Sequence, residues 1–540
     1  MPYKLGVSTG LFSIAKSADP EGRHEYLGIP RKALWSITKG VNFAQVDLES
    51  MAEFIEPDLD KKIKDLEGMG VEIGIHGEAR EYTSVLPFLD SALEEEWHRS
   101  HERLIKSLEG SGLVKSKYFL LHASASVSWQ LLWRDLQPTT LADVWGRPLS
   151  FFLKNEDEVL DWAVSTDFVR EIVRGLSKDT EGTYAREQLR ELVNDWAIRN
   201  QGKEPDDRTM AEFNRQAAEY GKAIVRNTFN RFISSSDETY GSERIAYYCM
   251  AKWMQDSKSC PRQLKEIWKE ICKDGDIDDK KWREEKGGSN WVPAVTCAYT
   301  WGHFNPEKCL RWPEKFKQPT DPKPILEKHK MYFVFETPMT GAGEEEQMRL
   351  GRPIHMLALV KRMGTPWGGL AFDWEHQLSG NIDPMKEAQE LPEGEGRLVK
   401  VIHAGYPAVV SPAHVPIPMG SEAQKYAYDI LWELRKKGFK EGWIIFERGG
   451  GQEPVKESVQ SLRLVVKYLE MDIPPDKLPD AFYGFEVGGI RWTRQQVAIR
   501  DHALEPLKGL LSVPEEEYGF MSTAAAAKGK LEEWKKSQLK

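Results

Sequence analysis

The sequence predicts a (β/α)8 barrel, the TIM-barrel fold, with a large helical insertion. Eight short runs along the chain are almost continuously apolar, as in parallel strands covered on both faces. Segments with helical periodicity separate most of these runs. Eight strands alternating with helices is the number that closes a TIM barrel. The runs are 3–9, 43–50, 71–77, 117–123, 331–337, 369–375, 398–404 and 442–448.

The segments between the runs have the features of helices that connect parallel strands. Residues 56–70 and 89–112 lie between the early runs, and each closes in a glycine suited to a helix C-terminus. Residues 344–364, 421–439 and 454–470 have the same pattern between and after the later runs. These segments are therefore the crossover helices that a parallel barrel requires.

One interval breaks the alternation. About 200 residues separate the fourth run from the fifth, whereas a βα unit needs roughly 30. This interval, 127–325, is rich in helix formers, tryptophan and charge, which predicts a mostly helical domain inserted at the functional end of the barrel. The barrel then comprises 1–126 and 326–471, and 472–540 form a helical C-terminal extension.

Composition limits the class of protein. The net charge of -10 argues against a protein that binds nucleic acid over its whole surface, although a local basic groove stays open. The N-terminus shows no signal peptide, and no stretch reaches the ~18 apolar residues of a membrane span. We therefore expect a cytoplasmic protein with no membrane partner. The five cysteines, all between Cys249 and Cys309, form no CxxC pair, so small buried side chains or an occasional disulfide are expected, with a structural metal as the alternative.

Histidines and carboxylates stand where the predicted strands end, at the end of the barrel where TIM-barrel enzymes carry their sites. Ionisable groups at the end of a buried strand are costly unless something neutralises them, and a bound cation can do so. Mixed imidazole and carboxylate ligands suit Zn²⁺, Mn²⁺ or Fe²⁺ better than Mg²⁺ or Ca²⁺. Taken singly, each histidine could be a hydrogen-bonded structural residue and each carboxylate a helix cap. The predicted metal ligands are His76, His122, Glu336, Asp373, His376, His403, His414 and Glu447.

Two segments resemble the endonuclease IV branch of the xylose isomerase-like superfamily. "GLAFDWEHQLSGNID" (369–383) is similar to that family's motif of a strand-end Asp, a His three residues on, small residues and an Asp. "FETPMTGAGEE" (335–345) is similar to its Glu followed by a short Gly-rich turn. The resemblance covers the eight predicted strands and leaves the insertion and the C-terminal extension outside.

The resemblance implies a set of metal ligands. One zinc of the family is bound by the histidines that end strands three and four and by the strand-five glutamate, which correspond to His76, His122 and Glu336. The same glutamate bridges to a second metal, and the other ligands of that metal correspond to Asp373, His403 and Glu447.

A third metal of the family carries over only in part. His376 and His414 match its histidines, but Pro412 stands where the family has an Asp, and "AGYP" replaces the Asn-Asp after the strand-seven histidine. The resemblance thus implies two or three divalent cations, with zinc first and manganese or iron as alternatives. Arg80 and Tyr82 match a loop that the family inserts into DNA, which implies substrate binding, with plain surface solvation as the alternative.

The activity implied by the resemblance is metal-dependent hydrolysis of a phosphodiester, in DNA at an abasic or damaged site or in another substrate. Glu336 and Glu447 would be the catalytic residues, the first bridging two cations and the second orienting the attacking hydroxide. A sugar isomerase or epimerase of the same superfamily is the alternative, because it needs one metal on Glu336, Asp373, His403 and Glu447. His76 and His122 favour the hydrolase, since one metal does not need them. A non-catalytic barrel that carries a binding module in its insertion is a third reading.

Overall fold

A closed barrel of parallel strands is the centre of the computed structural model, which describes 2–10, 28–77, 88–123, 141–165, 180–234, 243–272, 291–337, 350–408, 411–447 and 454–484. This topology confirms the predicted fold class. Neighbours along the chain are neighbours around the barrel, and the last strand closes it by parallel pairing with the first. The strands are β1 (Tyr3–Ser8), β2 (Phe43–Asp47), β3 (Glu72–His76), β4 (Tyr118–His122), β5 (Tyr332–Glu336), β6 (Gly368–Asp373), β7 (Val399–Ala404) and β10 (Gly442–Phe446).

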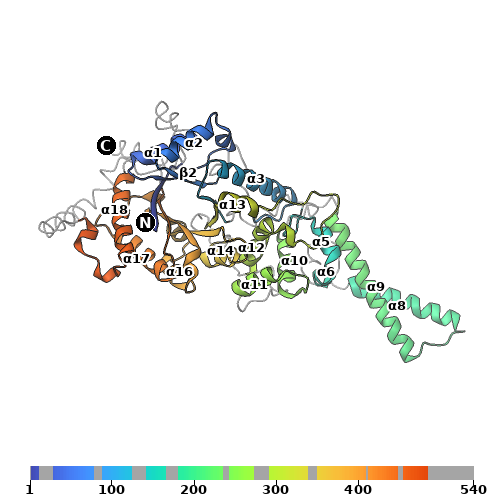
Figure 1. Ribbon diagram of the computed structural model, residues 1–540. Coiled ribbons are helices and arrows are strands. Elements are labelled where there is room, and N and C mark those ends of the chain that lie inside the picture. The colour runs from blue at the N-terminus through green and yellow to red at the C-terminus, as the bar shows by residue number, and fades with distance from the viewer. Residues whose placement is uncertain are drawn as a thin grey trace, which may run out of the picture.

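Helices surround the barrel (Figure 1). They bury apolar side chains; α17, for example, buries Ala427, Leu431 and Leu434, which are spaced four and three residues apart. The surrounding helices are α1 (Ile29–Thr38), α2 (Leu59–Gly68), α3 (Glu94–Leu113), α13 (Lys323–His329), α14 (Pro353–Val360), α15 (Trp374–Ser379), α16 (Pro384–Glu390), α17 (Glu422–Lys436) and α18 (Pro454–Glu470). Short 3-10 turns are η3 (Met51–Ile55), η5 (Pro306–Lys308), η7 (Glu395–Leu398), η8 (Pro475–Lys477) and η9 (Asp480–Tyr483).

Two helices begin later than their periodicity predicts. The Ser91 hydroxyl accepts from the Leu93 N–H and donates to Glu96, which holds the backbone in a turn and delays α3 until Glu94. Helix α14 begins at Pro353, whose fixed φ and missing N–H suit the first helical position.

Large side chains fill the barrel interior below the mouth. Tyr118 of β4 is fully buried there, and its ring lies over the backbone of Gly74 on β3. A Cβ atom at Gly74 would stand 2.3 Å from that ring, so glycine is required for the close approach. The inner layer consists of Phe43, Tyr118, Leu120, Val334, Ala371, Val401 and Ile445.

The contact between Gly74 and Tyr118 gives a stability prediction. Gly74→Ala should lower the free energy of unfolding by about 1–3 kcal/mol, because the added methyl group overpacks a filled interior. Urea unfolding followed by circular dichroism measures this. Gly70→Ala is not a suitable control, since Gly70 has a positive φ; Gly68→Ala, at a helical position with open space around it, should not destabilise. Equal stability of Gly74→Ala and wild type would contradict the close packing.

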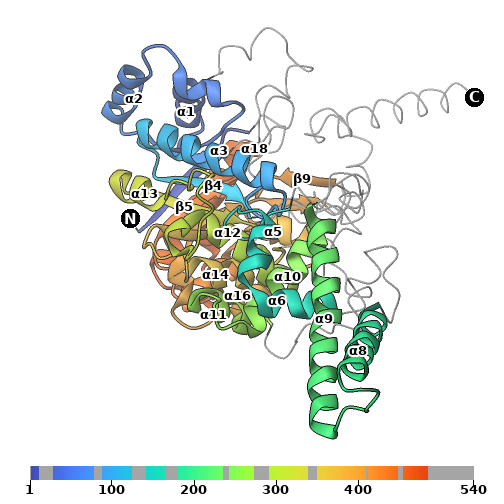
Figure 2. The same ribbon diagram turned by 90° about the vertical axis from the view of Figure 1, so that its right-hand side faces the viewer.

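A largely helical segment lies between β4 and β5. Its described helices are α5 (Leu149–Asn155), α6 (Asp157–Ser165), α8 (Thr180–Arg199), α9 (Asp207–Ser234), α10 (Glu243–Asp256), α11 (Arg262–Ile271) and α12 (Trp291–Phe304). Helix α12 is buried along its whole length, whereas α8 and α9 project from the body as a hairpin (Figures 1 and 2). Arg226 of α9 fixes the base of the hairpin through ion pairs with Asp157 and Asp161 of α6.

The five cysteines all lie among the described residues. In the part of the chain that the structure describes, no disulfide joins the five cysteines, and four of them are buried.

After β7 the chain forms an antiparallel pair, β8 (Tyr406–Ala408) and β9 (Ser411–Val415), in which Pro407 is in register with His414. None of the described helices combines the length and apolar content that a membrane crossing needs.

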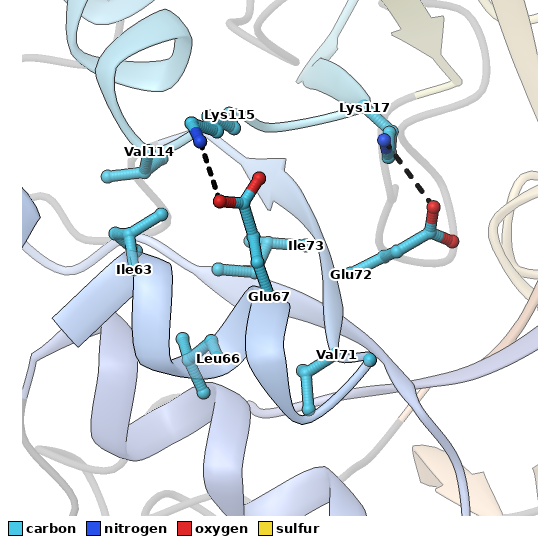
Figure 3. A pocket seen from close by; sticks show the side chains of 10 residues that line it. Ile63, Leu66, Glu67, Val71, Glu72, Ile73, Val114, Lys115 and Lys117 are labelled. Carbon is cyan, nitrogen blue, oxygen red and sulfur yellow. Dashed lines mark hydrogen bonds and ion pairs between the residues drawn. The ribbon is translucent and has the colours of Figure 1, made fainter. Parts of the chain in front are cut away.

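A cavity of about 330 Å³ lies at the opposite end of the barrel from the strand-end histidines (Figure 3). Lys115 pairs with Glu67 across it, and Lys117 pairs with Glu72 at the start of β3. Its charged groups are thus neutralised locally, and we assign it no function. The lining residues are Ile63, Leu66, Glu67, Gly70, Val71, Glu72, Ile73, Val114, Lys115 and Lys117.

Candidate metal centre

The strand ends bring six of the predicted ligands together at one mouth of the barrel. β3, β4, β5 and β6 end in their ligand residue, β7 carries its histidine one residue before its end, and Glu447 directly follows β10. Because neighbouring parallel strands are in register at this level, the side chains converge; His122 pairs with Glu336, and Asp373 with His403. The six residues are His76, His122, Glu336, Asp373, His403 and Glu447.

Glu336 lies at the centre of the group, and its two oxygens face different partners. Oε2 lies 3.5 Å from His76 Nε2 and 3.6 Å from His122 Nε2. Oε1 lies 3.5 Å from His376 Nδ1 and 2.5 Å from His403 Nδ1. A carboxylate arranged in this way can bridge two cations.

Two of the spacings around His403 Nδ1 fit zinc-like coordination, whereas its 2.5 Å separation from Glu336 Oε1 is a direct hydrogen-bond contact. Two ligand atoms bound about 2.1 Å from one tetrahedral cation lie about 3.4 Å from each other. His403 Nδ1 lies 3.3 Å from Asp373 Oδ2 and 3.2 Å from Glu447 Oε2, close to that value.

Two groups of donors have ligand atoms that all lie within 4.8 Å of one another. The first group is His76, His122 and Glu336, and the second is Glu336, Asp373, His376 and Glu447. Glu336 belongs to both. His403 faces the three carboxylates of the second group, so that group has five donors in reach.

Asp373 combines the two roles that the sequence left as alternatives. Its Oδ1 accepts from the backbone N–H groups of Glu375 and His376 and so caps α15. Its Oδ2 points to His403. The cap fixes the carboxylate, so the second oxygen is held toward the donor group.

His376 is fixed by the end of β5. Its Nδ1 lies 2.9 Å from the Thr337 carbonyl oxygen, which can only accept, so Nδ1 carries the proton. Nδ1 is also the atom that lies 3.5 Å from Glu336 and from Asp373, so the role of His376 as a ligand stays a prediction.

Burial and the charges of neighbouring side chains shift the pKa values of the residues in the candidate metal centre. Burial lowers the pKa of His122 well below its usual value, and the neighbouring His76 and His376 lower it further, so this imidazole is neutral and able to bind a cation. Burial alone would raise the pKa of Asp373, but His376 and His403 hold it well below its usual value. Burial raises the pKa of Glu336 despite the surrounding histidines. Despite burial, which alone would lower it, the pKa of His76 is raised by Asp47 and Glu336, and that of His403 is raised well above its usual value by Glu336, Glu447 and Asp373. A cation would bind these two histidines only by displacing a proton from each.

Several polar atoms of the centre are buried without a hydrogen-bond partner among the described residues: His122 Nε2, Glu336 Oε2 and Asp373 Oδ2. Glu336 and Asp373 are fully buried. The His122 ring is partly exposed at 37%, although its Nε2 is buried. Buried polar atoms of this kind are normally satisfied, and a group of them facing one point fits bound cations.

Sequence reasoning missed two residues of β2. Asp47 Oδ1 lies 2.9 Å from His76 Nδ1, and Gln45 Oε1 lies 2.9 Å from His403 Nε2. The rule that found the other residues could have found Asp47, since it too ends a buried apolar strand.

The side chains of three predicted site residues, and of the proline that replaces an Asp of the family's motif, lie outside the described residues. Arg80 and Tyr82 lie outside the described residues. The backbone of His414 and Pro412 belongs to β9, but their side chains lie outside the description. The third cation position therefore stays a prediction.

No protein-family model matches this chain, and no curated protein matches it. Among solved structures it is similar to a D-tagatose 3-epimerase-like protein, with 10% identity, a TM-score of 0.38, and coverage of 87% of this chain and 100% of that one. It is also similar to a 3-keto-D-glucoside 4-epimerase from E. coli in its apo form, with 8% identity, a TM-score of 0.33, and coverage of 86% and 99%. A third is a D-psicose 3-epimerase in the presence of D-fructose, with 9% identity, a TM-score of 0.36, and coverage of 93% and 99%.

These three structures are described as epimerases or epimerase-like, and none as an endonuclease. Membership in the endonuclease IV branch stays a prediction. The fold class rests on the chain's own strand order: it is a (β/α)8 barrel.

Proposed function

We propose that this chain is a metal-dependent enzyme that holds two divalent cations bridged by Glu336 and hydrolyses a phosphodiester. The observation that carries the proposal is the meeting of His76 and His122 with one oxygen of Glu336, while the other oxygen faces His376 and His403. A site for a single cation would have no use for the first pair. Zinc is the favoured cation, because the first group has two imidazoles and one carboxylate.

The roles of the residues follow from their positions. When bound, a pair of divalent cations polarises a phosphoryl oxygen and lowers the pKa of water toward neutrality. Glu336 fixes the separation of the two positions. Glu447, at the end of β10 and near His403, orients the attacking water and receives its proton. DNA with an abasic or damaged site is the substrate class implied by the sequence resemblance, and any other phosphodiester is compatible with the geometry.

A second candidate function is that of a sugar isomerase or epimerase, the alternative already raised by the sequence. The specific observation in its favour is that Glu336 and Glu447 both lie against His403, at 2.5 and 3.2 Å. Two carboxylates at one cation can remove and return a proton on carbon. Two of the similar solved structures are described as sugar epimerases and the third as epimerase-like.

One comparison separates the two candidates. The wild-type protein and the double variant His76→Asn/His122→Asn are assayed for nicking of an abasic DNA duplex, for hydrolysis of bis(p-nitrophenyl) phosphate, and for epimerisation of ketohexoses. The proposal predicts hydrolysis by the wild type and its loss in the double variant. Epimerisation by both proteins without hydrolysis would overturn the proposal in favour of the second candidate.

A further inference from the structure

Strand β2 contacts a histidine of each donor group, although it supplies no ligand itself. Gln45 and Asp47 are two residues apart and so point to the same face of the strand, into the barrel. Asp47 lies against His76 of the first group, and Gln45 against His403, which faces the second. Strand β2 thus supports both proposed cation positions, each through a different side chain.

Asp47 is held firmly on three sides. Its Oδ2 accepts from the Ser8 hydroxyl at 2.8 Å and from the Gly10 N–H at 2.7 Å. Its backbone carbonyl accepts from the ammonium group of the buried Lys32 at 2.8 Å. The remaining oxygen, Oδ1, accepts from His76 Nδ1 and leaves His76 Nε2 to face Glu336.

Gln45 is fully buried, and its side-chain oxygen serves two neighbours. The Tyr118 hydroxyl donates to Oε1 at 2.8 Å, and His403 Nε2 lies 2.9 Å from the same oxygen. An oxygen that accepts from both requires a proton on His403 Nε2. Nδ1, which faces Glu336, Asp373 and Glu447, is then the nitrogen that a cation would bind in place of the second proton that these carboxylates attract to it.

We propose that Gln45 is a positioning residue that selects Nδ1 of His403 as the ligand atom for the second cation, while Asp47 does the same for Nε2 of His76 at the first. This inference rests on the proposed two-cation site. It makes a specific demand on the side chain at position 45: the side chain must accept a hydrogen bond. A residue needed only for packing would make no such demand.

Two substitutions of Gln45 separate a hydrogen-bonding role from a packing role. Gln45→Met keeps the length and volume of the side chain but removes the acceptor. Gln45→Glu keeps the acceptor and removes the amide N–H donors. Tyr118→Phe keeps the ring under Gln45 and removes one of the two hydrogen bonds. Ile445→Val is the packing control, because it removes one methylene from the inner layer of the barrel and no hydrogen-bonding group.

The experiment is a competition titration of the full-length, metal-free proteins with Zn²⁺ and with Co²⁺, whose visible spectrum reports its ligands. Gln45→Met should weaken one of the two cation positions by about 10- to 100-fold and leave the other unchanged. Tyr118→Phe should weaken the same position by about 2- to 10-fold. Gln45→Glu and Ile445→Val should keep the cation affinity of both positions. Asp47→Asn should weaken cation binding at the first position, which His76 faces.

The possible results separate a failure of this inference from a failure of the proposed two-cation site. Equal affinities in Gln45→Met and wild type would overturn the inference alone, as would equal damage from Gln45→Met and Gln45→Glu. If Gln45→Met does not fold, unchanged affinity in Tyr118→Phe overturns it instead. A wild-type protein that binds no cation would overturn the two-cation site and the inference with it.

Discussion

Glu336→Gln should remove both cations from the protein at once. The substitution keeps the shape of the side chain but replaces the bridging carboxylate by a neutral amide, whose nitrogen cannot be a ligand. Because Glu336 belongs to both donor groups, we expect the affinity to fall at both positions by more than about 100-fold, the upper end of what a change outside the ligand shell costs. Hydrolytic activity should fall with it.

Equilibrium dialysis followed by metal analysis measures this loss. Glu387→Gln is the matched control, since Glu387 is also a buried carboxylate but pairs with Arg352 outside the metal centre. The control should keep the metal content of the wild type. If Glu336→Gln lost a single cation, or none, Glu336 would not be the bridge.

Removal of the cations by a chelator should strongly destabilise the fold. Glu336 and Asp373 are fully buried, and Glu447 lies beside them with little exposure, so without cations the neighbouring histidines have to offset much of their charge. At a free cation concentration of 100 to 1,000 times the dissociation constant, binding stabilises the folded state by about 3–4 kcal/mol.

Thermal unfolding with and without EDTA, and after Zn²⁺ is returned, measures that contribution. The unfolding temperature should fall with EDTA and recover with Zn²⁺ in the wild type. Glu336→Gln should show no response to either addition. An unfolding temperature that stays constant while metal analysis shows that the cations have left would contradict a structural contribution from the metal centre.

The barrel and the convergence of most of the candidate ligands could be predicted because one physical rule covers both. Strands buried on both faces are apolar throughout, so an ionisable residue at the end of such a run is conspicuous, as at His76 and Glu336. The closure of the barrel then forces those ends together. Asp373 shows a limit of this reasoning, since whether it can be both a helix cap and the predicted ligand depends on the direction of each carboxylate oxygen.

Other features depend on contacts that a sequence pattern does not contain. Gln45 lies inside an apolar strand, and its hydrogen bond to His403 joins residues 358 positions apart. The start of α3 depends on the side-chain hydrogen bonds of Ser91 rather than on periodicity. Helical periodicity predicted the insertion, but nothing in that pattern indicates that α8 and α9 project from it as a hairpin.

The number of cations per chain, in the wild type and in His122→Asn, tests the two-cation site most directly. Metal analysis of the dialysed proteins should give two divalent cations per wild-type chain and one per variant chain, because His122 belongs only to the first donor group. One cation in both proteins would contradict the two-cation site and leave His76 and His122 without the role proposed for them.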